Sequence, residues 1–355
     1  MQDLEPEGRA GDGATRTLLI ASTLAAVAAV VGVAIVVDAG PRDEKHPVAV
    51  ELPRQVEQPE ELGDVRWRRG FATAQAEARK SGKPMLVLFD EVPGCHTVKT
   101  YGARVLRHPL IVEAAETHFV PVVVYNNVEG DDREILNSFG EPTWNNPVVR
   151  IMTPDRKELV PRVAGDYTTA GLATAMSTAL GKSSPKWLQL FAEQSGAQRA
   201  GTRKATFAMY CFWSGEAHLG QKAGVVGTRT GFADGHEVVE VEYDPAAVSH
   251  AELASYAEKA KIRPLDAKEI RPSSKDDRYR LRHTAWKHVP MLGIQASRAN
   301  AAISRREDPA VYFSPRQRRF AQLAALHPDA GWPDDMGLGT FSSSWAQALL
   351  ASAAE

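Results

Sequence analysis

The stretch "GKPMLVLFDEVPGCHTV", residues 82–98, decides the first fold of this chain. Its residues 85–89 are all apolar, which is typical of a strand with both faces buried. A proline–glycine pair then forces a tight turn, and Cys95 follows at the point where a helix is expected to begin. A buried strand that leads through a turn into a helix predicts an α/β unit with a thiol at the helix N-terminus.

The segments around this stretch predict a first domain over residues 64–182. Apolar residues at helical spacing mark the helices, and β-branched runs mark the strands. Helices and strands alternate along the chain, which favours a sheet covered by helices. The predicted helices are residues 67–80, 101–106, 110–118, 131–139 and 168–180, and the predicted strands are residues 85–89, 119–125 and a hairpin within 145–163.

A second domain, of α+β type, is predicted over residues 204–327. A helical connector at 183–203 joins it to the first domain, and residues 328–355 are expected to form a loose tail rich in Gly, Pro and Ser. Ser249 is the predicted cap of the helix that follows it, because serine side chains accept hydrogen bonds from free helical N–H groups. The predicted strands are residues 205–210, 225–230 and 236–243, and the predicted helices are residues 215–221, 251–260, 294–304 and 315–326.

The N-terminal region predicts a membrane anchor. Residues 18–37 are twenty residues without a charge, about the length that a helix needs to cross roughly 30 Å of hydrocarbon. We therefore expect a disordered start at 1–16, a transmembrane helix at 17–38 and a proline-containing linker at 39–63. A cleaved signal peptide is the alternative, although its apolar region is usually about 7–15 residues long. The expected location is a single-pass membrane protein with its soluble domains outside the cytoplasm.

Composition excludes several classes of protein. The 355 residues allow two domains with apolar cores, and the formal net charge of −2 gives no electrostatic support for nucleic-acid binding. Two cysteines are too few for a disulfide-dense scaffold or a cysteine-rich zinc site. The ten histidines are scattered, so the sequence predicts no metal site and no cofactor.

Cys95 is a candidate catalytic thiol. A thiol reacts as its thiolate, and the free N–H groups and dipole at a helix N-terminus stabilise that anion. His96 follows it directly and adds positive charge when protonated. The alternative is an inert buried cysteine at the end of a strand, since free cysteine is among the most buried residue types.

These residues resemble the thioredoxin superfamily over about residues 64–182, through "GKPMLVLFD", "VPGCHTV", "FVPVVVYNN" and "NNPVVRIM". The turn is also similar to a narrower thioredoxin-like family whose signature is Val-Pro-Gly followed by cysteine or selenocysteine. The resemblance implies that Pro147, often with a cis peptide bond, faces the reactive turn and contributes to substrate binding. The chain has Val98 where ordinary thioredoxins have a second cysteine, and Thr97 falls one place earlier than in the narrower signature.

Cys211, in "ATFAMYCFWSGEAHLG", is the second candidate thiol. Phe212 and Trp213 follow it, and two aromatic rings beside a thiol form a suitable pocket for a methyl group on sulfur. Glu216 and Glu237 are the candidate acids, because a carboxyl group that burial keeps protonated can donate a proton to a sulfoxide oxygen. The alternative is that both rings are ordinary core residues.

Three stretches in this order resemble the A-class peptide-methionine sulfoxide reductases: "TFAMYCFWSGE", "GVVGTRTGFADG" and "HEVVEVEYDPAAVSHAEL". The resemblance spans residues 205–300 and is clearest near the start. It implies that Cys211 is the nucleophile, that Phe212 and Trp213 bind the methyl group, and that Glu237 is the catalytic acid.

The sequence departs from that family at several places. Met209 and Tyr210 stand where the family has glycines before the cysteine, and Phe232 stands where it has a tyrosine. The loop before the family's Gly-His-Ala-Glu motif is absent, and so are its C-terminal resolving cysteines. Without the tyrosine hydroxyl, one hydrogen-bond donor to the sulfoxide oxygen is lost. Removal of a single oxyanion-hole donor in other enzymes lowers the rate by about 10²–10³, and a similar loss is expected here.

Each half of the chain thus lacks its usual partner cysteine. We hypothesise that Cys95 resolves oxidised Cys211 and that an external thiol reductant recycles the pair, with an oxidised protein or peptide as substrate. One alternative is a non-catalytic, membrane-tethered binding or scaffold protein built from degenerate redox domains. Another is that Cys95 alone forms mixed disulfides with client proteins.

Overall fold

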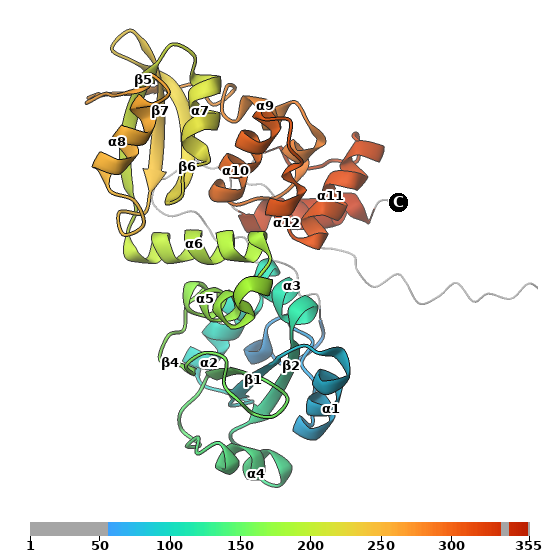
Figure 1. Ribbon diagram of the computed structural model, residues 1–355. Helices are drawn as coiled ribbons and strands as arrows, with labels where there is room; N and C mark the ends of the chain where they lie inside the picture. The colour runs from blue at the N-terminus through green and yellow to red at the C-terminus, as the bar shows by residue number, and fades with distance from the viewer. Residues whose placement is uncertain (1–55, 335–340, 354–355) are drawn as a thin grey trace, which may run out of the picture. The chain divides into compact units, whose positions relative to one another are not determined.

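The computed structural model describes residues 56–334 and 341–353 (Figure 1). The predicted disordered start, the predicted transmembrane helix at 17–38 and most of the predicted linker lie outside these residues. Within the described residues, no helix has the length and apolar character that crossing a membrane requires. The predicted fold class is therefore corrected: the described chain is an α/β fold with two sheets, and a membrane-spanning helix is not part of it.

The first sheet has four strands in the order β2-β1-β3-β4. β1 pairs parallel with β2 and antiparallel with β3, so the sheet is mixed. Every residue of β1 is buried, as its unbroken apolar run predicts for a central strand. The strands are β1 (Met85–Asp90), β2 (Val120–Tyr125), β3 (Val148–Met152) and β4 (Val163–Ala164).

Helices cover both faces of this sheet. They are α1 (Phe71–Ser81), α2 (His96–Tyr101), the π-helical turn η2 (Gly102–Leu106), α3 (Pro109–His118), α4 (Asp131–Ser138) and α5 (Thr169–Leu180). Alternate residues of β1 point to opposite faces. Leu86 and Leu88 belong to a core that includes residues of α3 and α5, whereas Met85, Val87 and Phe89 belong to a core with α1 and α4.

Three predicted elements differ in extent. The predicted helix at 67–80 begins at Phe71 instead, because Arg68 forms a strand bridge with β2 and Gly70, at φ +91°, turns the chain. The predicted helix at 101–106 exists but continues directly from α2. The second arm of the predicted hairpin is mostly irregular before it reaches β4.

The end of the predicted linker is folded. η1 (Glu60–Leu62) is a single 3-10 turn that packs against α2 and η2. Glu61 and Leu62 are buried. Gly63, at φ +61°, brings the chain so close to Leu106 that a Cβ would lie 2.4 Å from the Leu106 carbonyl carbon. The predicted linker is therefore folded at residues 60–62, where Glu61 and Leu62 are buried in the first domain.

α6 (Lys186–Ala200) forms the predicted connector. A short 3-10 turn, η3 (Gly181–Ser183), links it to α5, against which it packs. Trp187, Leu188 and Phe191 are buried in the same core as residues of α5.

The second sheet is antiparallel, in the order β8-β5-β7-β6-β9. Its central hairpin closes at Asp234 and Gly235, whose φ values of 50° and 76° are those of a two-residue hairpin turn with both φ angles positive. β7 has the bounds that its alternating sequence predicts. The strands are β5 (Arg203–Met209), β6 (Val225–Ala233), β7 (His236–Tyr243), β8 (Arg263–Pro264) and β9 (Arg271–Pro272).

Helix α7 (Phe212–Gly220) packs against β6 and β7 (Figure 1). α8 (His250–Glu258) begins at the predicted cap: Ser249 and Glu252 hydrogen-bond reciprocally with each other's backbone N–H. The remaining helical elements before residue 335 are α9 (Tyr279–Arg282), η4 (Ala285–His288), α10 (Gly293–Ser304), η5 (Pro309–Tyr312) and α11 (Pro315–Leu326).

Helix α12 (Phe341–Ser352) corrects the predicted loose tail. Trp345, Ala348 and Ala351 recur at helical spacing and are buried. The Trp345 ring lies edge-on to the ring of Phe320 in α11, with 5.2 Å between their centroids. This part of the tail is therefore a packed helix, because its apolar residues share one face.

Candidate functional site

Cys95 lies between β1 and a helix, in the predicted position. It is exposed and is the N-cap residue of α2, with φ −72° and ψ 175°. Gly94 has no room for a side chain, since a Cβ would lie 2.3 Å from the carbonyl oxygen of Glu91 and 2.8 Å from Val98. The thiol is therefore accessible and adjacent to the free N–H groups of a helix start.

Two asparagines after β2 hold the loops around this thiol. The Val92 N–H donates to Asn127 Oδ1 at 3.3 Å, and Asn127 Nδ2 donates to the Val92 carbonyl at 3.2 Å. Asn126 Nδ2 donates to the carbonyl of Asn145 at 3.2 Å, in the loop that ends at Pro147. The peptide bond before Pro147 is cis, and its ring is buried. The Cys95 turn and the loop of Pro147 are thus anchored on neighbouring residues.

Asp90, at the end of β1, is a candidate site residue that the sequence did not single out. It is fully buried; its Oδ1 accepts from the Glu91 N–H at 3.1 Å, and its Oδ2 has no hydrogen-bond partner. Burial raises the pKa of Asp90 to about 8, and the negative charges of Glu61 and Cys95 add to that effect. A carboxyl group at the end of an otherwise apolar strand, next to a thiol, was the signal available in the sequence.

Cys211 occupies the same kind of position in the second domain. It is the N-cap residue of α7, is half-exposed, and accepts a hydrogen bond on Sγ from Ser214 Oγ at 3.8 Å. The predicted helix at 215–221 begins earlier, at Phe212. Both cysteines therefore sit at helix starts, although the sequence predicted this only for the first.

Glu237 is held beside this second thiol. Its Oε2 accepts a hydrogen bond from the backbone N–H of Phe212 at 2.8 Å. In the sheet, Glu237 lies opposite Met209 on one side and Phe232 on the other, and Phe232 lies opposite Arg271. Directly paired residues point to the same face, so these four side chains form a row across the sheet. The Arg271 guanidinium carbon lies 4.7 Å from the centre of the Phe232 ring.

The two aromatic residues after Cys211 differ in their surroundings. Phe212 is buried and lies 5.4 Å from the Phe232 ring, between centroids. Trp213 is half-buried and stacks on Tyr279 with 4.0 Å between centroids, while its Nε1 donates to Asp276 at 3.2 Å. Both rings are thus fixed, and Trp213 is held by the segment that follows β9.

Glu216, the other predicted acid, takes part in a buried polar cluster. Its carboxylate accepts from Thr228 Oγ1 at 3.0 Å, from the Arg278 N–H at 2.7 Å and from Asn300 Nδ2 at 3.4 Å. Burial raises the pKa of Glu216 to about 7, against the opposing effect of the positive charge of Arg278. These bonds join α7 to β6 and α10, so the arrangement suits a structural acid.

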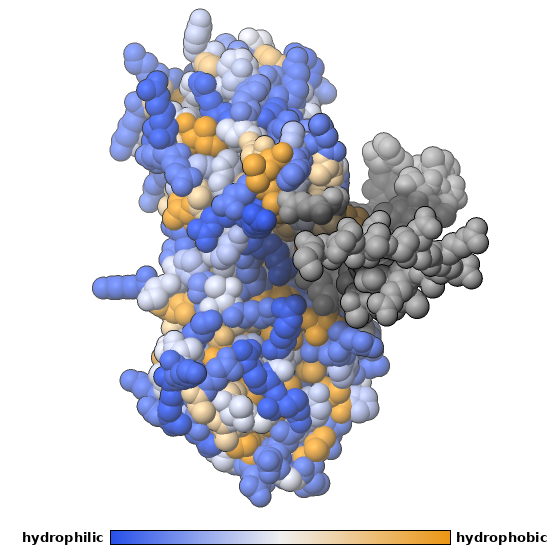
Figure 2. All heavy atoms as spheres, turned by 90° about the vertical axis from the view of Figure 1, so that its right-hand side faces the viewer, coloured by the Kyte–Doolittle hydropathy of each residue, from blue (hydrophilic) through white to orange (hydrophobic). Residues whose placement is uncertain are grey.

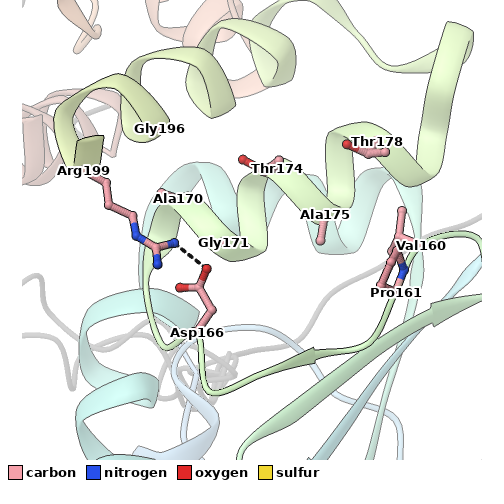
Figure 3. A pocket seen from close by; sticks show the side chains of 10 residues that line it. All are labelled: Val160, Pro161, Asp166, Ala170, Gly171, Thr174, Ala175, Thr178, Gly196 and Arg199. Carbon is pink, nitrogen blue, oxygen red and sulfur yellow. Dashed lines mark hydrogen bonds and ion pairs between the residues drawn. The ribbon is translucent and has the colours of Figure 1, made fainter. Parts of the chain in front are cut away.

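One cavity, of 430 Å³, lies away from these residues. It is lined by α5, α6 and the chain before α5, with an ion pair between Asp166 and Arg199 at one end (Figure 3). A smaller cavity, of 290 Å³, is lined in part by Trp213 and Ser214. None of the residues that line the 430 Å³ cavity is a site residue predicted from the sequence. Across residues 56–334 and 341–353, no three His, Cys, Asp or Glu side chains are grouped so that they could hold a metal ion.

Two exposed aromatic residues precede predicted site residues in the sequence, one before Pro147 and one before Cys211. On the face drawn in Figure 2, apolar residues form small groups between polar ones, as is normal for a folded protein. Trp144, in the loop before Pro147, is 80% exposed, and Tyr210, directly before Cys211, is 99% exposed. Exposed aromatic rings offer contact area to a partner, and Tyr210 does so directly before Cys211.

The fold and the two sites define a class of protein: α/β chains with a cysteine thiol at the N-cap of a helix that follows a strand. A thioredoxin-like family model matches residues 66–154. A solved structure, "DsbH Oxidoreductase", covers 40% of this chain and 96% of its own, with 14% identity and a TM-score of 0.30.

Curated relatives identify the second resemblance. The chain is 37% identical over 75 residues to peptide methionine sulfoxide reductase MsrA 1 of Nostoc sp. This match covers 16% of this chain and 46% of that protein. It is 42% identical over 67 residues to peptide methionine sulfoxide reductase MsrA of Geobacter metallireducens, covering 14% and 41%. It is 39% identical over 62 residues to peptide methionine sulfoxide reductase of Drosophila melanogaster, covering 14% and 25%.

The chain spans less than half the length of these relatives. It joins a thioredoxin-like region to a region similar to peptide methionine sulfoxide reductases, and the prediction of such a fusion from the sequence is confirmed.

Proposed function

We propose that the chain is a thiol-dependent oxidoreductase that reduces methionine sulfoxide in an oxidised peptide or protein. In this proposal Cys211 is the nucleophile and Cys95 is the thiol that resolves it. The hydrogen bond from the Phe212 N–H to Glu237 carries the proposal, because it fixes an acid next to the thiol at the start of α7. The similarity to methionine sulfoxide reductases supports the choice of substrate.

The first step transfers the sulfoxide oxygen. The Cys211 thiolate attacks the electron-poor sulfoxide, whose oxygen takes a proton from Glu237 as the S–O bond weakens. The thioether leaves as methionine and Cys211 becomes a sulfenic acid, so sulfur on the substrate is reduced and sulfur on the enzyme is oxidised. In this step Oε2 of Glu237 keeps the hydrogen bond from the Phe212 N–H, and Oε1 is the oxygen assigned to the proton transfer.

The second step resolves the sulfenic acid. The Cys95 thiol attacks Cys211, a disulfide forms, and the hydroxyl group leaves as water. A thiol reductant then exchanges with that disulfide, releases both cysteines as thiols and becomes a disulfide itself. Both cysteines are free thiols, and Cys95 is exposed, as attack on an external sulfur requires.

Single-turnover chemistry tests the proposal. Reduced protein, freed of reductant, is mixed with a methionine sulfoxide peptide, and the methionine formed per chain is measured. We expect about one methionine per chain, with formation of a Cys95–Cys211 disulfide seen by peptide mass mapping. Cys95→Ser should still form one methionine but leave a sulfenic acid that dimedone labels, and Cys211→Ser should form none.

Two results would overturn it. Methionine formation by Cys211→Ser at the wild-type rate would remove Cys211 from the reaction. A wild-type protein that forms one methionine but no disulfide between the two cysteines would remove Cys95 from the resolving step.

A second candidate function is disulfide exchange between Cys95 and client proteins. The exposure of Cys95 favours it, because attack on the disulfide of a client requires an accessible thiol. Incubation with a peptide carrying an activated disulfide should then yield an adduct at Cys95 and none at Cys211. A scaffold without chemistry would give neither adducts nor methionine.

A further inference from the structure

A cavity of 290 Å³ adjoins the Cys211 site along one side of α7. Trp213 and Ser214 both line it, and Ser214 Oγ donates to Cys211 Sγ at 3.8 Å. The cavity therefore begins one side chain away from the thiol. Ligand pockets in proteins are usually about 300–1,000 Å³, so this volume suits a single side chain of a larger ligand rather than a whole small molecule.

The charged residues that line this cavity are basic. Arg280 and Arg305 lie in its wall together with His218, and none of its lining residues is an Asp or a Glu. Arg305 is already occupied, because its Nε and Nη2 pair with Glu307 at 2.9 and 2.6 Å and its Nη1 donates to Gln221 at 2.6 Å. The Arg280 guanidinium is thus the charge of this wall that is left to meet a ligand.

Arg280 has no acidic partner of its own. Within the described residues it takes part in no ion pair and no hydrogen bond, and it is exposed. Its guanidinium carbon lies 5.8 Å from the centre of the Tyr279 ring, near the outer limit of a cation–π contact. Arginine presents five N–H donors in a planar fork that matches a carboxylate. An exposed arginine without an acidic partner, in a basic wall, therefore favours a carboxylate as ligand.

Buried hydrogen bonds fix the backbone on both sides of Arg280. The Arg278 N–H donates to Glu216 Oε2 at 2.7 Å, and the Leu281 N–H donates to Asn300 Oδ1 at 3.1 Å. Helix α10, which carries Asn300, packs against both α7 and α9 (Figure 1). Arg280 is therefore presented from an anchored backbone although its side chain is exposed, and the buried Glu216 carboxyl group helps to place it.

An aromatic stack joins this cavity to the place of the reacting sulfur. Trp213 stacks on Tyr279 with 4.0 Å between centroids, and Tyr279 directly precedes Arg280 in the chain. An extended peptide advances by about 3.3 Å per residue. A peptide whose methionine sulfoxide lies at Cys211 would therefore bring a residue one or two places away from the sulfoxide to the cavity.

We propose that this cavity receives an acidic side chain of the substrate, one or two residues from the methionine sulfoxide, and that Arg280 selects it. The guanidinium donates to both oxygens of the Asp or Glu carboxylate. Two acids of the protein contact the cavity wall, but Asp276 accepts from Trp213 Nε1 at 3.2 Å and Glu307 is in an ion pair, so neither occupies Arg280. The inference rests on the proposed reduction of methionine sulfoxide and adds the class of peptide that is reduced.

Peptides that differ at one residue test the inference. Each carries one methionine sulfoxide and either Glu or Gln at one of the two positions before or after it, and kcat/KM is measured with full-length protein and dithiothreitol. At one of these positions we expect kcat/KM to be about fivefold higher for the Glu peptide, a factor typical of one solvent-exposed ion pair. Arg280→Gln should bring this ratio to about one, and Arg280→Glu should invert it.

The matched control is Arg306→Gln, which removes the same charge from an exposed residue next to Arg305 but leaves the cavity wall unchanged. It should keep the fivefold ratio. Equal kcat/KM values for the Glu and Gln peptides at all four positions would overturn the inference, as would a ratio that survives in Arg280→Gln.

Binding separates failure of this inference from failure of the proposed function. In full-length Cys211→Ser, calorimetry should show the Glu peptide binding about fivefold more tightly than the Gln peptide, and the further change Arg280→Gln should remove the difference. If no peptide yields methionine with the wild-type protein, the proposed reduction is wrong and these affinities decide the inference alone. Equal affinities of the two peptides would then overturn it.

Discussion

Glu237 accepts the backbone N–H of Phe212 at 2.8 Å, so a side chain from β7 occupies a free amide at the start of α7. The two residues are far apart in sequence, and their bond brings the acid to the residue that follows Cys211. The contact caps helix α7 and also places the Glu237 carboxyl group at the residue that follows Cys211.

Replacement of Glu237 by Gln separates these two roles. Glutamine can still accept the Phe212 N–H, but it cannot donate a proton as an acid does. We expect kcat/KM for a methionine sulfoxide peptide to fall by about 10²–10³, the usual range for loss of a general acid, with little change in unfolding temperature. Glu240→Gln, in the same strand but paired with Lys204, is the control and should keep full activity. Equal activities of the two variants would contradict the role of Glu237.

Phe232→Tyr tests whether a missing hydroxyl limits the rate. Phe232 packs on Phe212 and has Arg271 over its ring, at the position where the related reductases have a tyrosine. Because a donor aimed at the reacting oxygen is often worth a large factor, we expect the tyrosine to raise kcat about tenfold. Phe232→Leu keeps an apolar side chain without a ring and should not exceed the wild-type rate. A tyrosine variant no faster than wild type would show that the hydroxyl is not limiting.

Sequence patterns predicted those elements whose bounds are set by residues close to them in the sequence. The alternating pattern of residues 236–243 fixed β7, and Ser249 with Glu252 fixed the start of α8 through a capping box. The start of α7 was missed because its cap, Glu237, comes from another strand. α12 was missed because the burial of Trp345 depends on a partner in α11.

The same distinction applies to the Cys95 site. The thiol, the turn and Pro147 stand in motifs that can be read along the chain. Asp90 could have been noticed as a carboxyl group at the end of an otherwise apolar strand, but Glu61 could not be identified as an acid of the site, because its burial depends on tertiary contacts. Glu61 is buried because η1 folds back onto α2 and η2, a contact that no periodicity in residues 39–63 indicates.

Asp90→Asn should stabilise the protein at alkaline pH. The pKa of Asp90 is raised to about 8, chiefly by burial, from an ordinary value of 3.8. The protonated carboxyl therefore contributes stability that is complete below about pH 4 and is lost as the pH rises through about 8. At pH 9 the buried Asp90 is ionised, which destabilises the folded protein by up to about 6 kcal/mol, and asparagine avoids this loss.

Urea unfolding of both proteins at pH 4.5 and pH 9 measures this difference. The variant should be the more stable at pH 9 and close to wild type at pH 4.5. Asp131→Asn, at the exposed start of α4, is the control and should show no such dependence. A destabilised Asp90→Asn at pH 9 would mean that the native carboxylate has a partner that offsets its burial.

His108 should make the protein sensitive to acid. It lies between the rings of Phe191 and Phe341, at 4.7 and 5.4 Å between centroids, and its Nδ1 accepts the Leu110 N–H. Burial lowers its pKa to about 4 from 6.5, so its contribution to stability is present above pH 6.5 and is lost as the pH falls through about 4. His108→Asn keeps an oxygen for the cap and should flatten the fall in unfolding temperature between pH 6.5 and 4. His96→Asn, at an exposed site, should leave that fall unchanged.

Gly102→Ala should release η1 without altering any charge. A Cβ at Gly102 would lie 2.1 Å from the Glu60 carbonyl oxygen, which is backbone and can only give way if the turn moves. We expect a loss of about 1–3 kcal/mol in the free energy of unfolding, as for overpacking of a filled site. We also expect the Asp90 titration midpoint to fall, because Glu61 moves away with its turn. Gly196→Ala is the matched control, since a Cβ there meets nothing within 4 Å and alanine favours the helix. If Gly102→Ala destabilises the protein but leaves the Asp90 midpoint in place, η1 supports the fold and does not tune the thiol site.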